Sequence, residues 1–312
     1  MLSDGRALAR VPPPLLVGSG IVSVQVGAGL AGRLFTQVPP AAVTGLRLWT
    51  AAVIMIAIGG KGLPRMLRDM VRRRSWRDGA VAVAFGVSLA VMNFSFYQAF
   101  ARIPLGIAVT IEFLGPLTVA VASSRRLIDL AWVVLAALGV ALLARGGTHL
   151  ASGAVPGSRG GSGLAVTGVA FALVAAAAWA AYILLSASTG RRLSGSSGLV
   201  IAMIIAALLV TPPGIAAGRA ALLRPAVLGT GTLIGLLSSV IPYRFELEAL
   251  RRIPARVFGI WLSLEPVAAA VVGLALLGES LAARDWAALS CVTVASAGAA
   301  RGAAGTAQAP QA

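Results

Sequence analysis

The sequence predicts an all-α integral membrane protein in which ten transmembrane helices form two inverted five-helix repeats. Three observations predict this fold. Residues of the set AVILMFWYC make up 58% of the 312 positions and charged residues only 12%, whereas soluble domains carry about 25% charged residues. Ten apolar stretches follow one another, and part of the first half recurs 150 residues later. Since so few charges cannot cover a water-facing surface, the composition argues against a soluble enzyme.

The apolar stretches have the length that a membrane requires. A bilayer core of about 30 Å needs about 20 apolar residues in a helix. The expected spans are 15–35, 42–60, 80–101, 104–123, 127–144, 164–188, 198–218, 226–250, 255–277 and 285–300. Arg6 and Arg10 before the first stretch also fit a signal peptide, but the nine comparable stretches that follow favour a membrane span.

A Gly/Ser-rich segment near the middle divides the chain. Such composition is typical of flexible linkers. We therefore expect a first repeat over residues 1–144, a linker over 145–163, a second repeat over 164–301 and a disordered tail over 302–312.

The distribution of Lys and Arg predicts the orientation. With the N-terminus in the cytoplasm, the inside segments hold 17 of the 26 basic residues and the outside segments hold 7, while Arg47 and Arg244 fall within spans. Basic residues concentrate in cytoplasmic loops, so both termini are expected inside. The net charge of +16 then reflects topology and contact with anionic inner-leaflet lipid, and no nucleic-acid partner is expected.

The internal repeat sets the relation between the halves. Residues 99–122 read AFARIPLGIAVTIEFLGPLTVAVA, and residues 249–272 read ALRRIPARVFGIWLSLEPVAAAVV. The two segments share an Arg-Ile-Pro entry and a proline at matching depth, Pro116 and Pro266. Since the copies are five spans apart, they must point in opposite directions. Inverted repeats of this kind build many secondary transporters, which bind substrate where the halves meet.

Two carboxyl groups lie beside these prolines. A proline in a helix frees the carbonyl four residues earlier, so Pro116 frees that of Glu112, while Pro266 directly follows Glu265. Residues three apart share a helix face, which puts both carboxyls on equivalent faces of the repeated helix. An acidic residue at mid-bilayer costs about 2.5–3.5 kcal/mol. We therefore expect a substrate or proton site with helix breaks at the two prolines. The alternative is a packing pair satisfied by Arg47 or polar neighbours.

Further polar residues of the third and eighth spans could face the same cavity. Asn93 and Tyr97 form one stripe, and Ser239, Tyr243 and Glu246 form another. Asn93, Tyr97, Tyr243 and Glu246 are therefore candidate substrate-binding residues, although interfacial anchoring is an equal alternative for the tyrosines.

Two other charged residues lie within predicted spans, and each has a structural interpretation beside a functional one. Arg47 lies about six residues into the second span, where it either binds a carboxylate in the membrane or snorkels to the outer face. Glu248 is four residues from both Arg244 and Arg252 and is expected in a structural ion pair. Glu279 and Asp285 are expected to cap the turn before the last span.

Several kinds of chemistry are excluded. Cys291 is the only cysteine and His149 the only histidine, so a disulfide, a multi-histidine metal site and a histidine-based triad are excluded. The Gly-rich segment lacks a Walker lysine, which leaves nucleotide hydrolysis unsupported. No metal and no cofactor are expected, and transport would have to use a gradient.

Several motifs carry a family resemblance, namely residues 107–126, Ile241-Pro-Tyr243, Glu246, residues 249–256, Leu264-Glu-Pro266 and Leu277-Gly-Glu279. With these motifs the sequence resembles the threonine/homoserine exporter family, in the EamA branch of the drug/metabolite transporter superfamily. The resemblance implies an EamA-type fold of ten helices, an inner-membrane location and export of small amino acids in exchange for protons. Arg244 departs from the family's small or polar residue after Pro-Tyr, which either alters substrate preference or pairs with Glu248.

A zwitterionic substrate such as threonine or homoserine suggests how the candidate residues could act. Glu112 or Glu265 would bind its ammonium, while Arg47, Asn93, Tyr97 or Tyr243 would bind its carboxylate. Desolvation favours the neutral form of a buried carboxyl, so such a group could carry a proton in one direction and the amine in the other. Export of another metabolite or drug is the main alternative. A membrane enzyme or an assembly subunit is less favoured, and a second copy of the chain is a candidate partner.

Overall fold

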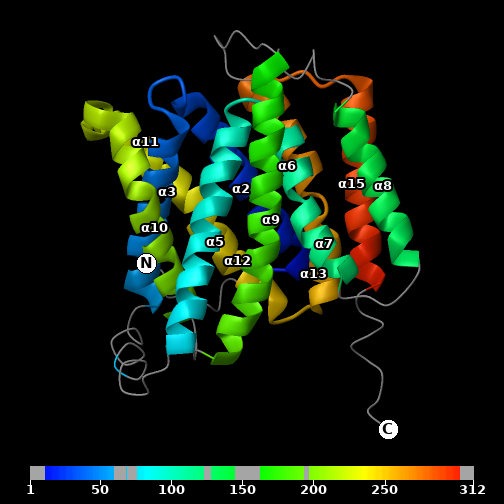
Figure 1. Cartoon of the computed structure of the whole chain (residues 1–312), viewed down its shortest axis with the longest axis horizontal. Helices are drawn as coiled ribbons and strands as arrows, with labels where there is room; N and C mark the ends of the chain where they lie inside the picture. The colour runs from blue at the N-terminus through cyan, green and yellow to red at the C-terminus, as the bar shows by residue number, and fades with distance from the viewer. Residues whose placement is uncertain are drawn as a thin grey trace.

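The computed structural model describes residues 11–59, 68, 76–122, 128–144, 162–192 and 197–302, and every regular element in these ranges is a helix (Figure 1). Of the expected linker only Ser162 and Gly163 are described, and of the expected tail only Gly302. The basic loop after residue 60 also lies largely outside the described residues.

The described elements are α-helices, one short 3-10 helix (η3) and two short π-helices (η4 and η5). They are α2 (Pro13–Leu34), α3 (Pro40–Gly59), α5 (Trp76–Phe100), α6 (Leu105–Glu112), α7 (Leu114–Ala122), α8 (Ile128–Ala144), α9 (Ser162–Arg192), α10 (Ser197–Gly218), η3 (Arg219–Leu223), α11 (Pro225–Gly235), η4 (Leu236–Val240), α12 (Ile241–Leu250), α13 (Ala255–Leu262), α14 (Glu265–Val272), η5 (Gly273–Leu277) and α15 (Ala283–Gly302).

Helices long and apolar enough to cross a membrane account for most of this bundle. Among the described residues eight stretches meet that condition, from Pro13–Leu34 to Val257–Leu277. The apolar part of α8, Asp129–Leu143, is shorter. Helix α15 has 20 residues but carries Ser, Thr and Gly along its length. The prediction of an all-helical, multi-pass membrane protein is therefore confirmed, with eight spans established by length and composition where ten were expected.

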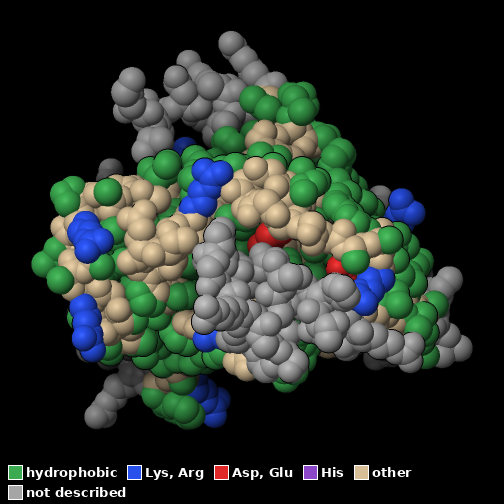
Figure 2. Space-filling model, turned by 90° about the horizontal axis from the view of Figure 1, so that it is seen from above, with side chains coloured by type: hydrophobic (Ala, Val, Ile, Leu, Met, Phe, Trp, Pro, Cys, Tyr) green, Lys and Arg blue, Asp and Glu red, His purple; other side chains and the backbone are tan. Residues whose placement is uncertain are grey.

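The outer surface of the bundle is apolar. Large aliphatic side chains such as Val166, Leu15 and Leu184 are 70%, 61% and 57% exposed, respectively. Figure 2 shows Lys and Arg side chains in separate small patches at one end of the molecule, with little acidic surface between the apolar and backbone atoms. Such an aliphatic exterior suits hydrocarbon, because lipid tails satisfy it as well as a protein core would.

The helices pack in pairs that join the two halves of the chain. Helix α2 packs on α12 and α5 on α9, while α3 packs on α10, α6 on α14 and α8 on α15. Figure 1 shows the α8–α15 pair at one side of the molecule and α3, α10 and α11 at the other, with α5 and α9 between them. Each half therefore buries its helices mainly against the other half.

Glycines allow the closest of these contacts. A Cβ on Gly106 of α6 would lie 2.8 Å from the Cα of Ala270 of α14, and one on Gly115 of α7 would collide with the backbone of Ala176 of α9. Small residues at helix crossings let backbones approach in this way in membrane proteins. The first crossing brings the two broken helices of the fold together.

Both broken helices are interrupted just before a proline. Helix α6 ends at Glu112 and α7 begins at Leu114, while α13 ends at Leu262 and α14 begins at Glu265. Phe113 and the pair Ser263–Leu264 form the interruptions, which precede Pro116 and Pro266. The first break thus follows a carboxyl-bearing residue and the second precedes one.

Candidate functional site

A central cavity of about 330 Å³ lies among these helices. Its lining residues come from α2, α3, α5, α6, α7, α9, η4, α12, α13 and α14. Both breaks open onto it, since Glu112 and Pro116 line it from the first broken helix and Leu262 and Glu265 from the second. The cavity therefore sits where the two halves meet.

Three carboxyl groups line the cavity. They belong to Glu112 of α6, Glu246 of α12 and Glu265 of α14. Glu112 and Glu265 are each only 9% exposed. Gathering three carboxyls away from bulk water is costly unless protons or cations neutralise them. The arrangement is thus suited to binding protons or an amine.

Arg47 is the cationic residue of the cavity lining, and it is held by the η4 turn. Its Nε donates to Oγ of Ser239 at 3.3 Å, and its Nη2 donates to the carbonyl oxygen of Ser238 at 3.1 Å. The guanidinium carbon lies 5.4 Å from the ring centroid of Tyr97, within cation–π range. These bonds keep Arg47 in the cavity and not at the outer surface, so the snorkelling interpretation is wrong.

The η4 turn is a π-helical insertion between α11 and α12. Such bulges are frequent at functional sites because they leave backbone groups outside the regular hydrogen-bond ladder. Here the carbonyl of Leu237 accepts a 2.7 Å bond from the Ser23 hydroxyl of α2, while that of Ser238 accepts Arg47. One turn therefore ties α2 and α3 to the second half at the cavity.

Among the predicted site residues, Asn93, Tyr243, Glu246 and Arg47 line the cavity together with the two glutamates. The side-chain amide of Asn93 donates to the carbonyl oxygen of Leu89 at 2.8 Å. This bond uses the amide nitrogen within its own helix.

Two predicted residues do not belong to the lining. Tyr97 is fully buried and packs its ring against Phe35 at 5.8 Å and Phe96 at 5.9 Å between centroids. Tyr97 lies one helical turn beyond Asn93, and its ring contacts the guanidinium of Arg47. Pro266 is likewise not a lining residue, because it lies one position beyond the carboxyl that reaches the cavity.

Sequence reasoning missed four prominent lining residues. Gln25, Met92, Trp179 and Tyr182 also face the cavity. Gln25 is a polar residue in the middle of an apolar span, and this signal could have identified it by the same insertion-cost argument as the glutamates. Trp179 and Tyr182 lie on α9, and only its packing on α5 brings them to the site.

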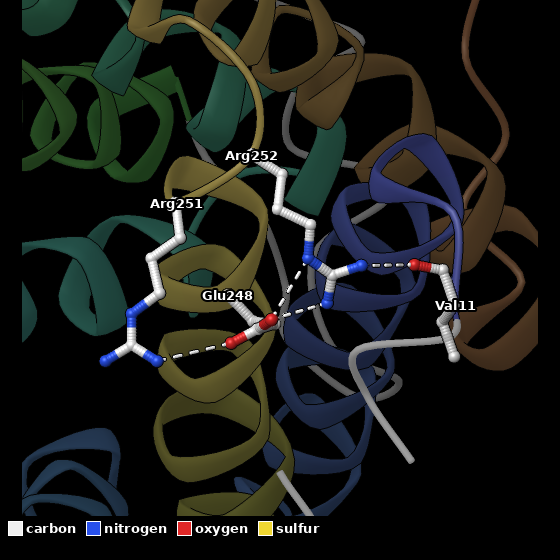
Figure 3. A network of polar contacts seen from close by, with 4 residues as sticks. All are labelled: Val11, Glu248, Arg251 and Arg252. Atoms are coloured by element: carbon white, nitrogen blue, oxygen red, sulfur yellow. Dashed lines mark hydrogen bonds and ion pairs between the residues drawn. The ribbon is translucent and has the colours of Figure 1, made fainter. Parts of the chain in front are cut away.

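Three further acidic residues, Glu248, Glu279 and Asp285, accept hydrogen bonds near helix ends. Glu248 accepts from Nε of Arg252 at 3.0 Å and from Arg251 at 3.4 Å, while Arg252 also donates to the carbonyl oxygen of Val11 at 2.9 Å (Figure 3). The ion-pair partners of Glu248 are therefore Arg251 and Arg252, not Arg244.

Glu279 and Asp285 accept backbone hydrogen bonds near the turn before α15. Oε2 of Glu279 accepts the N–H of Leu105 at 2.9 Å, and Oδ2 of Asp285 accepts that of Ala282 at 2.9 Å. Burial raises the pKa of Glu279 from 4.5 to about 7, against the smaller lowering effect of the Leu105 bond. Glu279 thus links the start of α6 to the end of the second broken helix. Within the described residues no three Cys, His, Asp or Glu side chains are placed so that they could hold one metal ion.

Comparisons with known proteins agree with this architecture. Residues 166–300 match the EamA-like transporter family. The threonine/homoserine exporter RhtA of Escherichia coli K12 is 39% identical over 295 residues, which cover 94% of this chain and 93% of RhtA. RhtA of Salmonella typhimurium LT2 is 38% identical over 301 residues, with 96% and 94% coverage. One solved crystal structure has the same fold, with a TM-score of 0.59, 18% identity and coverage of 91% of this chain and 95% of that one.

A helical membrane bundle with a charged cavity between two broken helices, together with these similarities, defines a membrane transporter and not an enzyme. The chain belongs to the EamA-like transporter family and, within it, to the threonine/homoserine exporters. It is a multi-pass protein of the bacterial inner membrane.

Proposed function

We propose that the chain exports small amino acids such as threonine and homoserine by proton antiport. The observation that carries this proposal is the central cavity, which holds one guanidinium and three carboxyls. A zwitterion presents one ammonium and one carboxylate at fixed separation, and this cavity offers a partner for each. The relatives at 38–39% identity are named as exporters of these two amino acids.

The charged residues of the cavity would each bind one end of the zwitterion. Arg47 would bind the carboxylate, since a guanidinium matches carboxylate geometry and its bonds to Ser238 and Ser239 fix its position. Glu112 at the end of α6 and Glu265 at the start of α14, both beside a helix break, would bind the ammonium. Asn93 and Tyr243 would complete the site.

Proton coupling follows from the excess of carboxyls. Three ionised carboxylates against one guanidinium would leave the empty cavity strongly negative, which buried surroundings disfavour. Protons would neutralise the carboxyls when no amine is bound, and an arriving ammonium would displace a proton. The same groups would therefore carry protons inward and the amino acid outward. A proton gradient would drive the cycle without a bound cofactor.

Alternating access would use the two repeats as moving parts. If the second half repeats the first in inverted order, the α2–α12 contact must have a counterpart in the α9–α5 contact, while α3–α10, α6–α14 and α8–α15 pair equivalent helices. The packing has this pattern, which supports two inverted five-helix repeats over residues 1–144 and 164–301. Including α8 and α15, the chain would cross the membrane ten times and keep both termini in the cytoplasm.

Export of another small metabolite is the second candidate, and the lining itself favours testing it. Phe96, Trp179 and Tyr182 give one part of the cavity an aromatic surface that suits an apolar side chain. A panel of labelled amino acids and apolar amines, assayed side by side, would separate the two candidates.

The test uses purified protein in proteoliposomes loaded with labelled threonine. An imposed proton gradient is expected to drive threonine exchange by the wild type, while Glu112→Gln abolishes the proton-driven component because the amide neither ionises nor binds an exchangeable proton. Glu248→Gln is the matched control, since this carboxyl lies outside the cavity and its loss should leave exchange largely intact. Proton-driven exchange at the wild-type rate in Glu112→Gln would overturn the role of this carboxyl.

A further inference from the structure

Gln25 is the unexplained polar group of the cavity. It lies in the middle of α2, is 2% exposed, and lines the cavity with its near neighbours Val24 and Ala28. Its Oε1 is buried and has no hydrogen-bond partner among the described residues. A buried amide oxygen left without a donor destabilises the unliganded protein, so a ligand that supplied the missing donor would recover this cost.

Among the other polar groups of the lining, the Oγ of Ser238 is also buried without a partner, but it lies against the backbone of Gly27 of α2. Arg47 matches a carboxylate, and the glutamates match an ammonium or protons. The amide nitrogen of Asn93 is engaged by the carbonyl of Leu89. Gln25 adds a neutral amide that both donates and accepts. Its chemical complement is a group that also does both, which is a hydroxyl.

The η4 turn places Gln25 relative to Arg47. Ser23, two residues before Gln25, donates to the carbonyl oxygen of Leu237, and the next carbonyl along accepts Arg47. A side chain on α2 and a guanidinium on α3 are thereby fixed against the same π-helical turn. A ligand whose carboxylate binds Arg47 therefore has its own side chain within a cavity lined by Gln25.

We propose that Gln25 is a specificity-determining residue that hydrogen-bonds the side-chain hydroxyl of a small hydroxy amino acid. The proposal rests on the proposed export function and adds the selection among amino acids of similar size. Sites built to bond a hydroxyl discriminate strongly against analogues that lack it, because the buried polar group is then left unpaired. Threonine should bind better than valine, its isostere with a methyl in place of the hydroxyl, and homoserine better than norvaline.

The experiment compares inhibition of labelled threonine exchange by unlabelled threonine, valine, homoserine and norvaline in proteoliposomes. Gln25→Met keeps the length and volume of the side chain and removes the amide. We expect this variant to reduce the threonine-over-valine preference by about ten-fold, the equivalent of one lost hydrogen bond, with valine affinity unchanged or improved. Gln98→Met is the matched control, because Gln98 is a buried glutamine outside the cavity lining.

The outcomes are distinguishable. An unchanged preference in Gln25→Met, or an equal loss of affinity for all four amino acids, would overturn the role of Gln25 while leaving export intact. Failure of the wild type to exchange threonine at all would overturn the export function and this inference with it. If Gln25→Met does not give monodisperse protein, Gln25→Asn serves instead, since its amide is one methylene short. It should weaken the preference, and a wild-type preference in that variant would contradict the proposal.

Discussion

The two broken helices enter their membrane segments through the same backbone turn. The N–H of Arg102 bonds the carbonyl of Ala99 at 2.8 Å, and that of Arg252 bonds the carbonyl of Ala249 at 2.9 Å. Pro104 and Pro254 are then the N-cap residues of α6 and α13, with φ, ψ of −52°, 144° and −58°, 144°. Residues 150 positions apart thus share one local structure.

The side chains of the same two turns differ. Arg102 bonds the neutral Oε1 of Gln98 at 2.8 Å and lies 5.1 Å over the ring of Phe171. Arg252 instead pairs with the carboxylate of Glu248 and holds the chain at Val11. Both turns therefore share one backbone geometry, while the arginine bonds a neutral amide in the first turn and a carboxylate in the second.

Each broken helix also contributes one carboxyl to the cavity, and the two carboxyls lie on different sides of the break in their helices. Glu112 closes α6 before its break, whereas Glu265 opens α14 after its break. We expect Glu265→Gln to lower proton-driven threonine exchange by at least about 30-fold, since losing a buried charged partner costs about 2 kcal/mol or more. Initial rates in proteoliposomes, with Glu248→Gln as control, measure this.

The comparison becomes sharper if exchange is also measured without a proton gradient. A variant that retains threonine counterflow but loses the proton-driven component has lost coupling alone. One that loses both has lost substrate binding. Full proton-driven activity in Glu265→Gln would show that only the first broken helix carries the function.

Glu279 is expected to make the stability of the fold depend on pH, an effect of intermediate size. Burial raises its pKa from 4.5 to about 7 in the folded chain, so the folded state binds this proton more tightly than the unfolded state. This contribution to stability is present below about pH 4.5 and is lost as the pH rises through about 7. The melting temperature of the wild type should fall across this window.

The variant Glu279→Gln removes the titration of this one carboxyl. Its amide oxygen can still accept the Leu105 N–H, so the hydrogen bond is kept. We expect its melting temperature, followed by intrinsic fluorescence in detergent, to fall less steeply with pH than that of the wild type. Parallel slopes for the two proteins would contradict the assignment.

The smallest expected effect is a difference in the salt dependence of the melting temperature between variants of Arg102 and Arg252. Arg252→Met removes an ion pair whose side chains are 24% and 18% exposed. Its contribution is screened as the Debye length falls from about 10 Å at 0.1 M salt to about 3 Å at 1 M. Arg102→Met removes a bond to a neutral amide. The loss of melting temperature in Arg252→Met should therefore shrink at high salt, whereas that in Arg102→Met should not. Equal salt dependence would show that the turns do not differ electrostatically.

Local pattern was enough to predict much of the site. Glu112 and Glu265 stood out because carboxyls are costly in an apolar span, and Glu246 stood out because it shares a helical stripe with Tyr243. All three line the cavity. The same argument applied to Arg47 gave two alternatives, since a side chain six residues into a span reaches either the surface or the interior. The Ser238 carbonyl and the Ser239 hydroxyl decided between them.

The sequence by itself determined the membrane-spanning helical fold, the family and the positions where the helices break, because composition, length and proline chemistry act locally. Only the tertiary structure decided which polar residues share the cavity. Tyr97 lies outside the lining and Gln25 belongs to it, because α5 packs on α9 and α2 on α12, helices that are distant in the sequence. Helix periodicity fixes which residues share a face, but the rotation of each face toward the cavity is set by packing.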